Sequence, residues 1–310
     1  MRRNLHLRAF RKKTIITLTF SLAMFALAVI ISNVKAPSPV KVLFDAGHGE
    51  EFSALTSWST LVSELNKTGM EVHVTTAVIN DTILQNYDVF VIGGWARTNF
   101  SQSELIAIGK FVSNGGGLLL AYDENAEEVY NGISNALQVG IIFPSANPIE
   151  NSEGNRAVNI TTFDRGHPVF TNVTSFQIMY GHALNLSGNA KAIAWSSITD
   201  RPSNQPVIVT DTHGNGKVLA IGDSNLWNGN RDWDSDGSWD LYDEDNLQLA
   251  INILKWLQAP SEVWAPTPET AAASAAITVG ITGGLYALSS AIGAVPPPVS
   301  YTHLRAHETV

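Results

Sequence analysis

The chain lacks cysteine altogether, and charged residues make up only 15% of it. Without cysteine it can form neither a disulfide framework nor a thiol nucleophile. Basic residues are the scarcer sign, with 19 Lys and Arg against 28 Asp and Glu, which gives a formal net charge of −9. Because nucleic-acid binding needs a basic surface, this composition argues against a nucleic-acid partner for the folded part.

The one dense basic segment stands at the N-terminus, where residues 1–13 carry basic residues and no acid. Residues 14–34 then carry no charge, and a run of this length can cross a bilayer core. A basic flank before such a run orients the N-terminus to the cytoplasm. We therefore predict a basic cytoplasmic tail, a transmembrane anchor at 14–34, and a location at the cell membrane with the main domain outside the cytoplasm. The alternative is a cleaved signal peptide, although Pro37 directly follows its only cleavage candidate.

A second uncharged run, residues 270–295, is rich in Ala, Gly, Ser and Thr. Gly280 and Gly284 have the spacing that lets helices pack closely in lipid, so we predict a second transmembrane helix that contacts a membrane-protein partner. The alternative is a flexible linker of small residues. Residues 261–269 form a Pro-containing linker before this run. Residues 299–310 resemble a translated sequencing adapter, and we read no function into that tail.

Between the two runs we predict one domain at residues 36–260, because strand and helix patterns alternate there. Apolar runs such as Val40–Phe44 are typical of strands that are buried on both faces. Two later strand patterns meet at the turn formed by Gly214 and Gly216, which predicts a hairpin. Such alternation favours an α/β fold with a doubly wound, mostly parallel sheet, which the two transmembrane helices would flank.

Helix signals separate the predicted strands. An apolar stripe begins at Phe52, and Gly69 marks the end of that helix. Ser101 and Glu104 have the spacing of a capping box, which predicts a helix start. The last predicted helix covers Glu244–Leu257.

Polar and glycine residues follow several of the predicted strands. In open parallel sheets, ligands bind beyond the carboxyl ends of the strands. The sequence therefore predicts any ligand site near the residues in these positions, which are Asp45, Gly93, Gly94, Tyr122, Asp123 and Asp223.

Several short phrases in this order resemble the class I glutamine-amidotransferase-like superfamily, which has a flavodoxin-like sheet. The closer likeness is to its non-enzymatic branch, which includes domains similar to those of intraflagellar-transport and gliding-type transport accessory proteins. The resemblance implies the fold over residues 41–257. It also implies a cysteine on the turn after the strand LLLAYDE, where this chain has Ala121, Tyr122 and Asp123. The resemblance therefore implies the fold without amidotransferase chemistry. The phrases are VLFDAGHGE, YDVFVIGGW, IGKFVSNGGGLLLAYDE, GHPVF, GNGKVLAIGDSNLW and DNLQLAINILKWL.

The loop after the first strand holds Asp45, His48 and Glu50. An Asp at a strand end can orient a histidine base or share a metal with it, and His182 could join them in space. These residues, with Gly94 and Asp223 from neighbouring strand ends, form our candidate ligand site. The catalytic candidates are Asp45, His48 and His182. The alternative is a turn in which the Asp45 carboxylate accepts backbone N–H groups and the glycines permit the bend.

The segment DWDSDGSWDLYD has the spacing of a calcium loop, with acidic residues at its first, third, fifth, ninth and twelfth places and glycine at its sixth. Carboxylates are hard oxygen ligands that suit Ca²⁺. We predict a calcium site there, although no helix precedes the loop and its last ligand is Asp, as in dockerin-like loops, and not Glu. The alternative is a solvated acidic loop before a helix. The predicted ligands are Asp232, Asp234, Asp236, Ser238, Asp240 and Asp243.

Six N-x-[ST] sequons support an exposed glycosylated domain that resembles archaeal surface proteins. Together these patterns predict a membrane-anchored, calcium-stabilised extracytoplasmic domain that binds a partner or small ligand and is not an enzyme. One alternative is an extracytoplasmic hydrolase that uses Asp45 and His48. Another is an accessory subunit of a membrane transporter. The sequons lie at Asn66, Asn80, Asn99, Asn159, Asn172 and Asn185.

Overall fold

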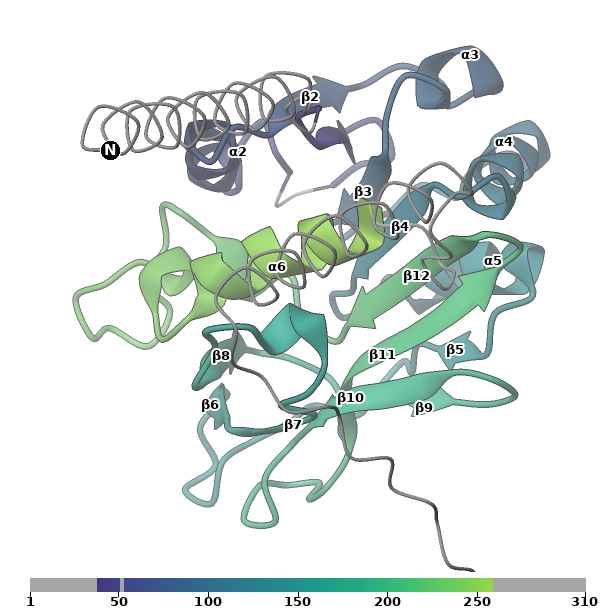
Figure 1. Ribbon diagram of the computed structural model, residues 1–310. Helices are drawn as coiled ribbons and strands as arrows, with labels where there is room; N and C mark the ends of the chain where they lie inside the picture. The colour runs from purple at the N-terminus through teal and green to yellow at the C-terminus, as the bar shows by residue number, and fades with distance from the viewer. Residues whose placement is uncertain (1–37, 51–52, 259–310) are drawn as a thin grey trace, which may run out of the picture. The chain divides into compact units, whose positions relative to one another are not determined.

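A computed structural model describes residues 38–50 and 53–258, and an eight-stranded mixed sheet is the centre of this part of the chain (Figure 1). The strand order is β2-β1-β3-β4-β12-β11-β10-β7. The first five strands in this order are parallel, and the last three add antiparallel neighbours. The predicted mostly parallel sheet is therefore confirmed. The strands are β1 Lys41–Asp45, β2 Glu71–Thr75, β3 Val89–Gly93, β4 Gly117–Ala121, β7 Thr162–Phe163, β10 Lys191–Trp195, β11 Pro206–His213 and β12 Gly216–Ile221.

Helices cover both faces of this sheet, as the alternating pattern predicts (Figure 1). One core cluster joins α2 and α6 to side chains such as Phe44 and Leu219. The other joins α4 and α5 to side chains such as Phe90 and Leu120. Because successive strand residues point to opposite faces, an apolar run supplies both cores at once. The helices are α2 Ser59–Lys67, α3 Asp81–Leu84, α4 Gln102–Ser113, α5 Glu127–Leu137 and α6 Asn246–Gln258.

The sequence patterns predict the starts of α4 and α6 to within two residues, but they predict the start of α2 poorly. The capping box of Ser101 and Glu104 is present at the start of α4. The helix expected from Phe52 instead begins at Ser59, since the backbone N–H groups of Thr56 and Trp58 both donate to the carbonyl of Ser53 in a tight turn. The last helix begins at Asn246 and not at Glu244.

Two short ribbons lie outside the large sheet, and the sequence patterns predicted neither of them. Strands β6 (Ala157–Ile160) and β8 (Phe176–Met179) pair antiparallel, as do β5 (Ile141–Ile142) and β9 (Asn185–Leu186). Three 3₁₀ turns complete the described chain. They are η1 Pro168–Phe170, η2 Asn225–Trp227 and η3 Asp240–Tyr242.

Several predictions concern residues outside the described part. These are the basic tail, both predicted transmembrane runs, the linker at 261–269 and the tail at 299–310. Among the residues that are described, no helix is long and apolar enough to cross a membrane. The side chains of all six sequon asparagines lie in the described part, and all six residues are exposed.

Candidate functional site

The predicted strand-end residues meet at one edge of the sheet, because β1, β3, β4 and β12 are parallel and adjacent. They do not form a single cluster there. Asp45 belongs to a network around His48, and Asp223 belongs to a network around Asn225. Among the described residues, no hydrogen bond or ion pair joins Asp45 or His48 to His182 or Asp223.

His48 is held by carboxylates on both sides of its ring. Its Nδ1 lies 2.6 Å from Oδ2 of Asp45, and its Nε2 lies 3.2 Å from Oε1 of Glu104. The ring also stacks on Phe100, with centroids 3.6 Å apart. Burial lowers the pKa of His48, but the hydrogen bond and charge of Asp45 and the charge of Glu104 raise it more, so the net pKa lies above its usual value. A histidine whose two nitrogens are both occupied is a clamp between β1 and α4, not a free base.

Glu50 completes this network. Its Oε2 accepts the backbone N–H of His48 at 2.9 Å, while burial and then the hydrogen bond and charge of Asp45 raise its pKa to about 8. Ligand atoms of Asp45, His48 and Glu50 lie within 4.8 Å of one another, close enough to share a metal ion. A carboxyl group with this pKa is protonated at neutral pH and can donate to Asp45. We therefore interpret the three residues as a buried hydrogen-bonded network.

Trp58 occupies the space that follows β3, where Gly94 was a predicted ligand residue. A Cβ at Gly93 would come within 2.3 Å of the Trp58 ring. The ring is 1% exposed, and its Nε1–H donates to the carbonyl of Ser224 at 3.0 Å. The indole thus packs over the last residue of β3 and reaches the segment that follows β12.

The turn after β4, which carries the cysteine in amidotransferases, is also closed here. The Tyr122 hydroxyl donates to the carbonyl of Pro144, and burial raises the pKa of Tyr122. Asp123 accepts hydrogen bonds from the side chains of Ser224 and Asn225, at 2.7 and 3.3 Å. Burial raises the pKa of Asp123 to about 6. No side chain on this turn is an activated nucleophile.

Asp223 and His182 are buried separately from the His48 network. Asp223 accepts the backbone N–H groups of Met179 and Asn225, both at 2.7 Å, so it anchors the ribbon of β6 and β8 to the end of β12. Burial, with a smaller effect of Arg156, lowers the pKa of His182 to about 4. His182 is therefore neutral at neutral pH. The hydrolase hypothesis needs these side chains to converge on an open cleft; no hydrogen bond or ion pair among the described residues joins the two groups.

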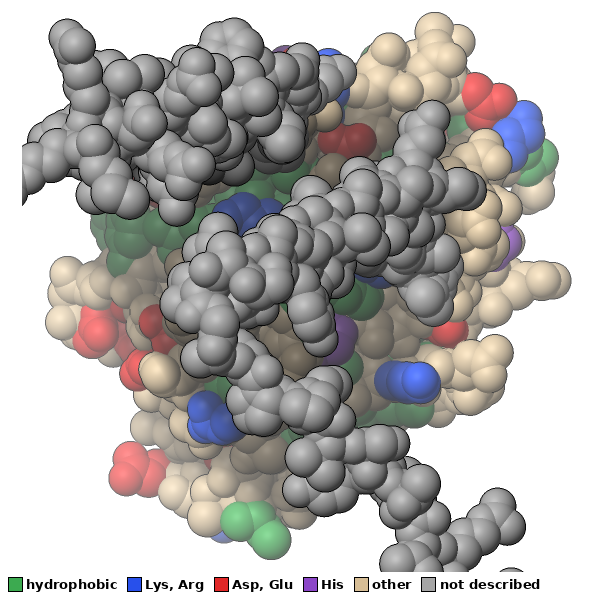
Figure 2. All heavy atoms as spheres, viewed as in Figure 1, with side chains coloured by type: hydrophobic (Ala, Val, Ile, Leu, Met, Phe, Trp, Pro, Cys, Tyr) green, Lys and Arg blue, Asp and Glu red, His purple; other side chains and the backbone are tan. Residues whose placement is uncertain are grey.

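The acidic loop has the curled shape that its spacing predicts. The backbone N–H of Asp236 donates to Oδ1 of Asp232 at 3.1 Å, and that of Gly237 donates to Oδ2 of Asp232 at 3.0 Å. Gly237 has φ +97°, a conformation that favours glycine. Carboxylate oxygens of Asp232, Asp234 and Asp236 lie within 4.8 Å of one another. Figure 2 shows acidic side chains at the left margin of its face, where the loop before α6 projects in Figure 1.

Two further carboxylates of this segment are buried beneath the loop. Asp240 is 1% exposed and Asp243 is 6% exposed. Burial raises the pKa of Asp240 to about 7 and that of Asp243 to about 6, and the charges of Asp234 and Asp236 contribute to the shift at Asp243. Ser238, also predicted as a ligand, directs its hydroxyl to the carbonyl of Trp239.

A polar groove of about 810 Å³ lies beside this loop, and the sequence patterns did not reveal it. The ribbon of β6 and β8 lines it together with amide and hydroxyl side chains. Two aromatic rings line it as well: Tyr180 and Trp233 are 38% and 36% exposed, with ring centroids 5.7 Å apart. The only signals in the sequence were two four-residue alternating runs, which are too short to distinguish from loops. The groove residues outside the ribbon include Asn151, Asn155, Arg156, Thr161, Tyr180, Ser197, Thr199, Asp200, Trp233 and Asp234.

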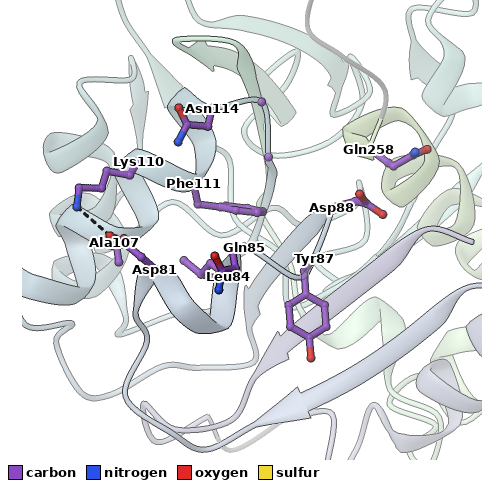
Figure 3. Close-up of a pocket in the computed structure, with 12 residues that line it drawn as sticks. Asp81, Leu84, Gln85, Tyr87, Asp88, Ala107, Lys110, Phe111, Asn114 and Gln258 are labelled. Carbon is purple, nitrogen blue, oxygen red and sulfur yellow. Dashed lines mark hydrogen bonds and ion pairs between the residues drawn. The ribbon is translucent and has the colours of Figure 1, made fainter. Parts of the chain in front are cut away.

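A second depression, of about 530 Å³, lies at the opposite end of the parallel strands (Figure 3). Asp88, which precedes β3, lines it together with side chains of α3 and α4. Lys110 and Asp81 form an ion pair of 2.9 Å at its rim, and Phe111 forms part of its wall. Since ligands of parallel sheets bind at the carboxyl ends of strands, this depression is at the wrong end to be the predicted site.

Comparisons with known proteins agree with this fold. The family model described as the IFT52 GIFT domain matches residues 41–143. The structure described as the mmIFT52 N-terminal domain is similar with a TM-score of 0.59 and 18% identity, over 70% of this chain and 97% of that chain. A structure of the cytoplasmic protein STM1381 from Salmonella typhimurium LT2 gives a TM-score of 0.52 and 16% identity, over 71% of this chain and 100% of that chain. No curated protein matches the chain.

These findings show a mixed α/β fold of the amidotransferase-like type, and they correct one prediction. The predicted location at a cell membrane, with the main domain outside the cytoplasm, is wrong. No described helix could cross a bilayer, and the similar structures include the mmIFT52 domain and a protein titled cytoplasmic.

Proposed function

We propose that this chain is a non-catalytic binding domain that takes up an extended polypeptide segment of a protein partner along strand β6. The supporting observation is the direction of the main-chain groups of β6, which lines the polar groove.

The hydrogen bonds of β8 define which groups of β6 point outward. Main-chain groups of Gln177 and Met179 bond to side chains of Asn246, Asp223 and Asn225, so they face away from β6. In an antiparallel pair, the residues opposite them also direct their N–H and C=O groups away from the partner strand. The register places Ala157 opposite Met179, and Asn159 opposite Gln177.

Strand β6 is consequently an edge strand with an open side. Among the described residues, the main-chain N–H and C=O groups of Ala157 and Asn159 have no hydrogen-bond partner. An exposed strand edge of this kind is a template for strand addition, in which main-chain hydrogen bonds supply affinity and neighbouring pockets supply specificity.

The walls of the groove suit a polypeptide. Tyr180 and Trp233 offer flat apolar surfaces, and the Arg156 guanidinium lies 5.1 Å from the centre of the Tyr180 ring. Amide and hydroxyl groups from Asn155 and Thr199 can bond to peptide groups. The likeness to the IFT52 GIFT domain agrees, since the branch that the sequence resembles contains accessory proteins, which work with other proteins.

The test uses a displayed library of seven-residue peptides, selected on the full chain, and fluorescence anisotropy to measure the affinity of the selected peptides. Asn159→Pro removes an outward N–H group, and proline is tolerated at strand edges, so the pairing of β6 with β8 is retained. We expect this variant to bind the peptides at least about tenfold more weakly, which is the effect of losing one or two main-chain hydrogen bonds.

Asn159→Ala is the matched control. It removes the side-chain hydrogen bond to Glu244 and keeps the main-chain N–H, so it should bind the peptides as the wild type does. Equal loss in both variants, or a failure of the library to yield any binding peptide, would contradict the proposal.

A further inference from the structure

We propose that the segment Asp232–Asp243 and its buried carboxylates form a calcium site. This inference goes beyond the proposed function and does not depend on peptide binding. The acidic cluster at the loop surface would not by itself define a site. The observation that points to a cation is the pair of buried carboxylates beneath it.

Three of the four oxygens of these two carboxylates lack hydrogen-bond partners among the described residues. Both side-chain oxygens of Asp243, and Oδ2 of Asp240, are buried without a partner among the described residues. The Ser238 hydroxyl donates to the carbonyl of Trp239 at 3.4 Å. Native structures rarely leave buried carboxylate oxygens unpaired, and a bound ion is one of the few explanations.

The Asp240 carboxylate faces the loop, because its Oδ1 accepts the backbone N–H of Trp233, between Asp232 and Asp234, at 3.0 Å. Carboxylate oxygens of Asp232, Asp234 and Asp236 lie within 4.8 Å of one another on the same loop. Repulsion between them is a cost that a divalent cation would remove.

The surrounding structure fixes the deep side of this region before any ion binds. The backbone N–H of Asp240 donates to the carbonyl of Arg231 at 3.0 Å, and Nδ2 of Asn246 donates to the carbonyl of Asp240 at 2.7 Å. Leu241 is 0% exposed and anchors the 3₁₀ turn in the core. The loop itself is curled by Asp232, whose carboxylate accepts two backbone N–H groups. The buried carboxylate at the ninth place is thus held against the loop that carries the first, third and fifth.

Calcium fits this arrangement better than other common divalent ions. An all-oxygen set without His or Cys disfavours zinc and other transition metals. Magnesium requires short, regular octahedral coordination and keeps its waters, whereas calcium accepts many carboxylates in flexible geometry.

The test is thermal unfolding of the full chain after chelation, with calcium or magnesium chloride added. A ligand that binds only the folded state raises the melting temperature, and calcium at 100 times its dissociation constant should raise it by about 5–10 °C. Magnesium at the same concentration should give less than half of that shift. No shift with calcium, or an equal shift with magnesium, would overturn the proposal.

Two variants locate the site. Asp243→Asn keeps the side-chain shape and removes one negative charge, so without calcium it should melt no lower than the wild type, and the calcium shift should be lost. Asp236→Asn, on the loop surface, should reduce the rise in melting temperature that calcium causes. It tests the same site if the buried variant Asp243→Asn misfolds. Asp164→Asn, in a distant turn, is the control and should keep the full shift. A full calcium shift in both loop variants would overturn the assignment.

Discussion

The ring of Trp58 lies where a side chain at position 93 would project, and Gly93 is the last residue of β3. The close approach explains the glycine, since even a methyl group there would meet the indole at 2.3 Å. The indole also reaches the segment after β12, where its Nε1–H donates to the carbonyl of Ser224 at 3.0 Å. The groove along β6 is the surface to which we assign the proposed function.

Gly93→Ala should therefore destabilise the domain. Overpacking of a closed core position costs about 1–3 kcal/mol in free energy of unfolding, which urea denaturation can measure. Gly109→Ala is the matched control, because a Cβ there meets nothing within 4 Å inside α4, and alanine favours helix by about 1 kcal/mol. If Gly93→Ala is as stable as the wild type, Trp58 does not pack over Gly93 as described.

The network of Asp45, His48 and Glu50 should make stability depend on pH. The folded pKa of Glu50, about 8, lies above its unfolded value near 4.5, so the folded state binds the proton more tightly. This contribution is complete below about pH 4.5 and disappears as pH rises to 8. The raised pKa of His48 acts in the same direction.

Glu50→Gln keeps the donor that protonated Glu50 provides and cannot ionise. The stability of the wild type relative to this variant should fall between pH 5 and 8, by at most about 1.4 kcal/mol per pH unit. Chemical denaturation at several pH values measures this, with Glu153→Gln at an exposed position as the control. A parallel pH dependence in wild type and Glu50→Gln would show that Glu50 titrates normally.

Tyr180 allows the aromatic surface of the groove to be tested without damage to the fold. Its φ of +60° is unusual for a tyrosine and is tolerated by asparagine. Tyr180→Asn should thus leave the free energy of unfolding nearly unchanged. It should weaken the binding of the selected peptides about five- to tenfold, since one aromatic contact contributes about 1 kcal/mol to binding. Anisotropy titrations measure the affinity, and an unchanged affinity would remove Tyr180 from the binding surface.

The sequence predicts contacts between residues that are close along the chain, and it does not predict contacts between residues that are far apart along the chain. The capping box of Ser101 and Glu104 spans one helical turn and is present as predicted. The contact of Asp45 with His48 is equally local. Glu104 as the second partner of His48 comes from another element, and no local pattern reveals it.

The same limit applies to the binding surface and to the acidic loop. Pairing of Asn159 with Gln177 across the ribbon joins two strands too short to show a reliable period. The spacing of the Asp residues predicts calcium ligands. It does not predict that Asp240 and Asp243 are buried, because this burial depends on the hydrogen bond from Asn246 that anchors η3.

The most direct measurement compares one selected peptide on two variants. Asn159→Pro changes the open edge of β6, and Glu50→Gln changes the buried network after β1. We predict that anisotropy titrations will show at least about tenfold weaker binding for Asn159→Pro and wild-type affinity for Glu50→Gln. Wild-type peptide affinity in Asn159→Pro, together with loss of peptide binding in Glu50→Gln, would contradict the proposal. Such a result would indicate that the peptide binds near the strand ends.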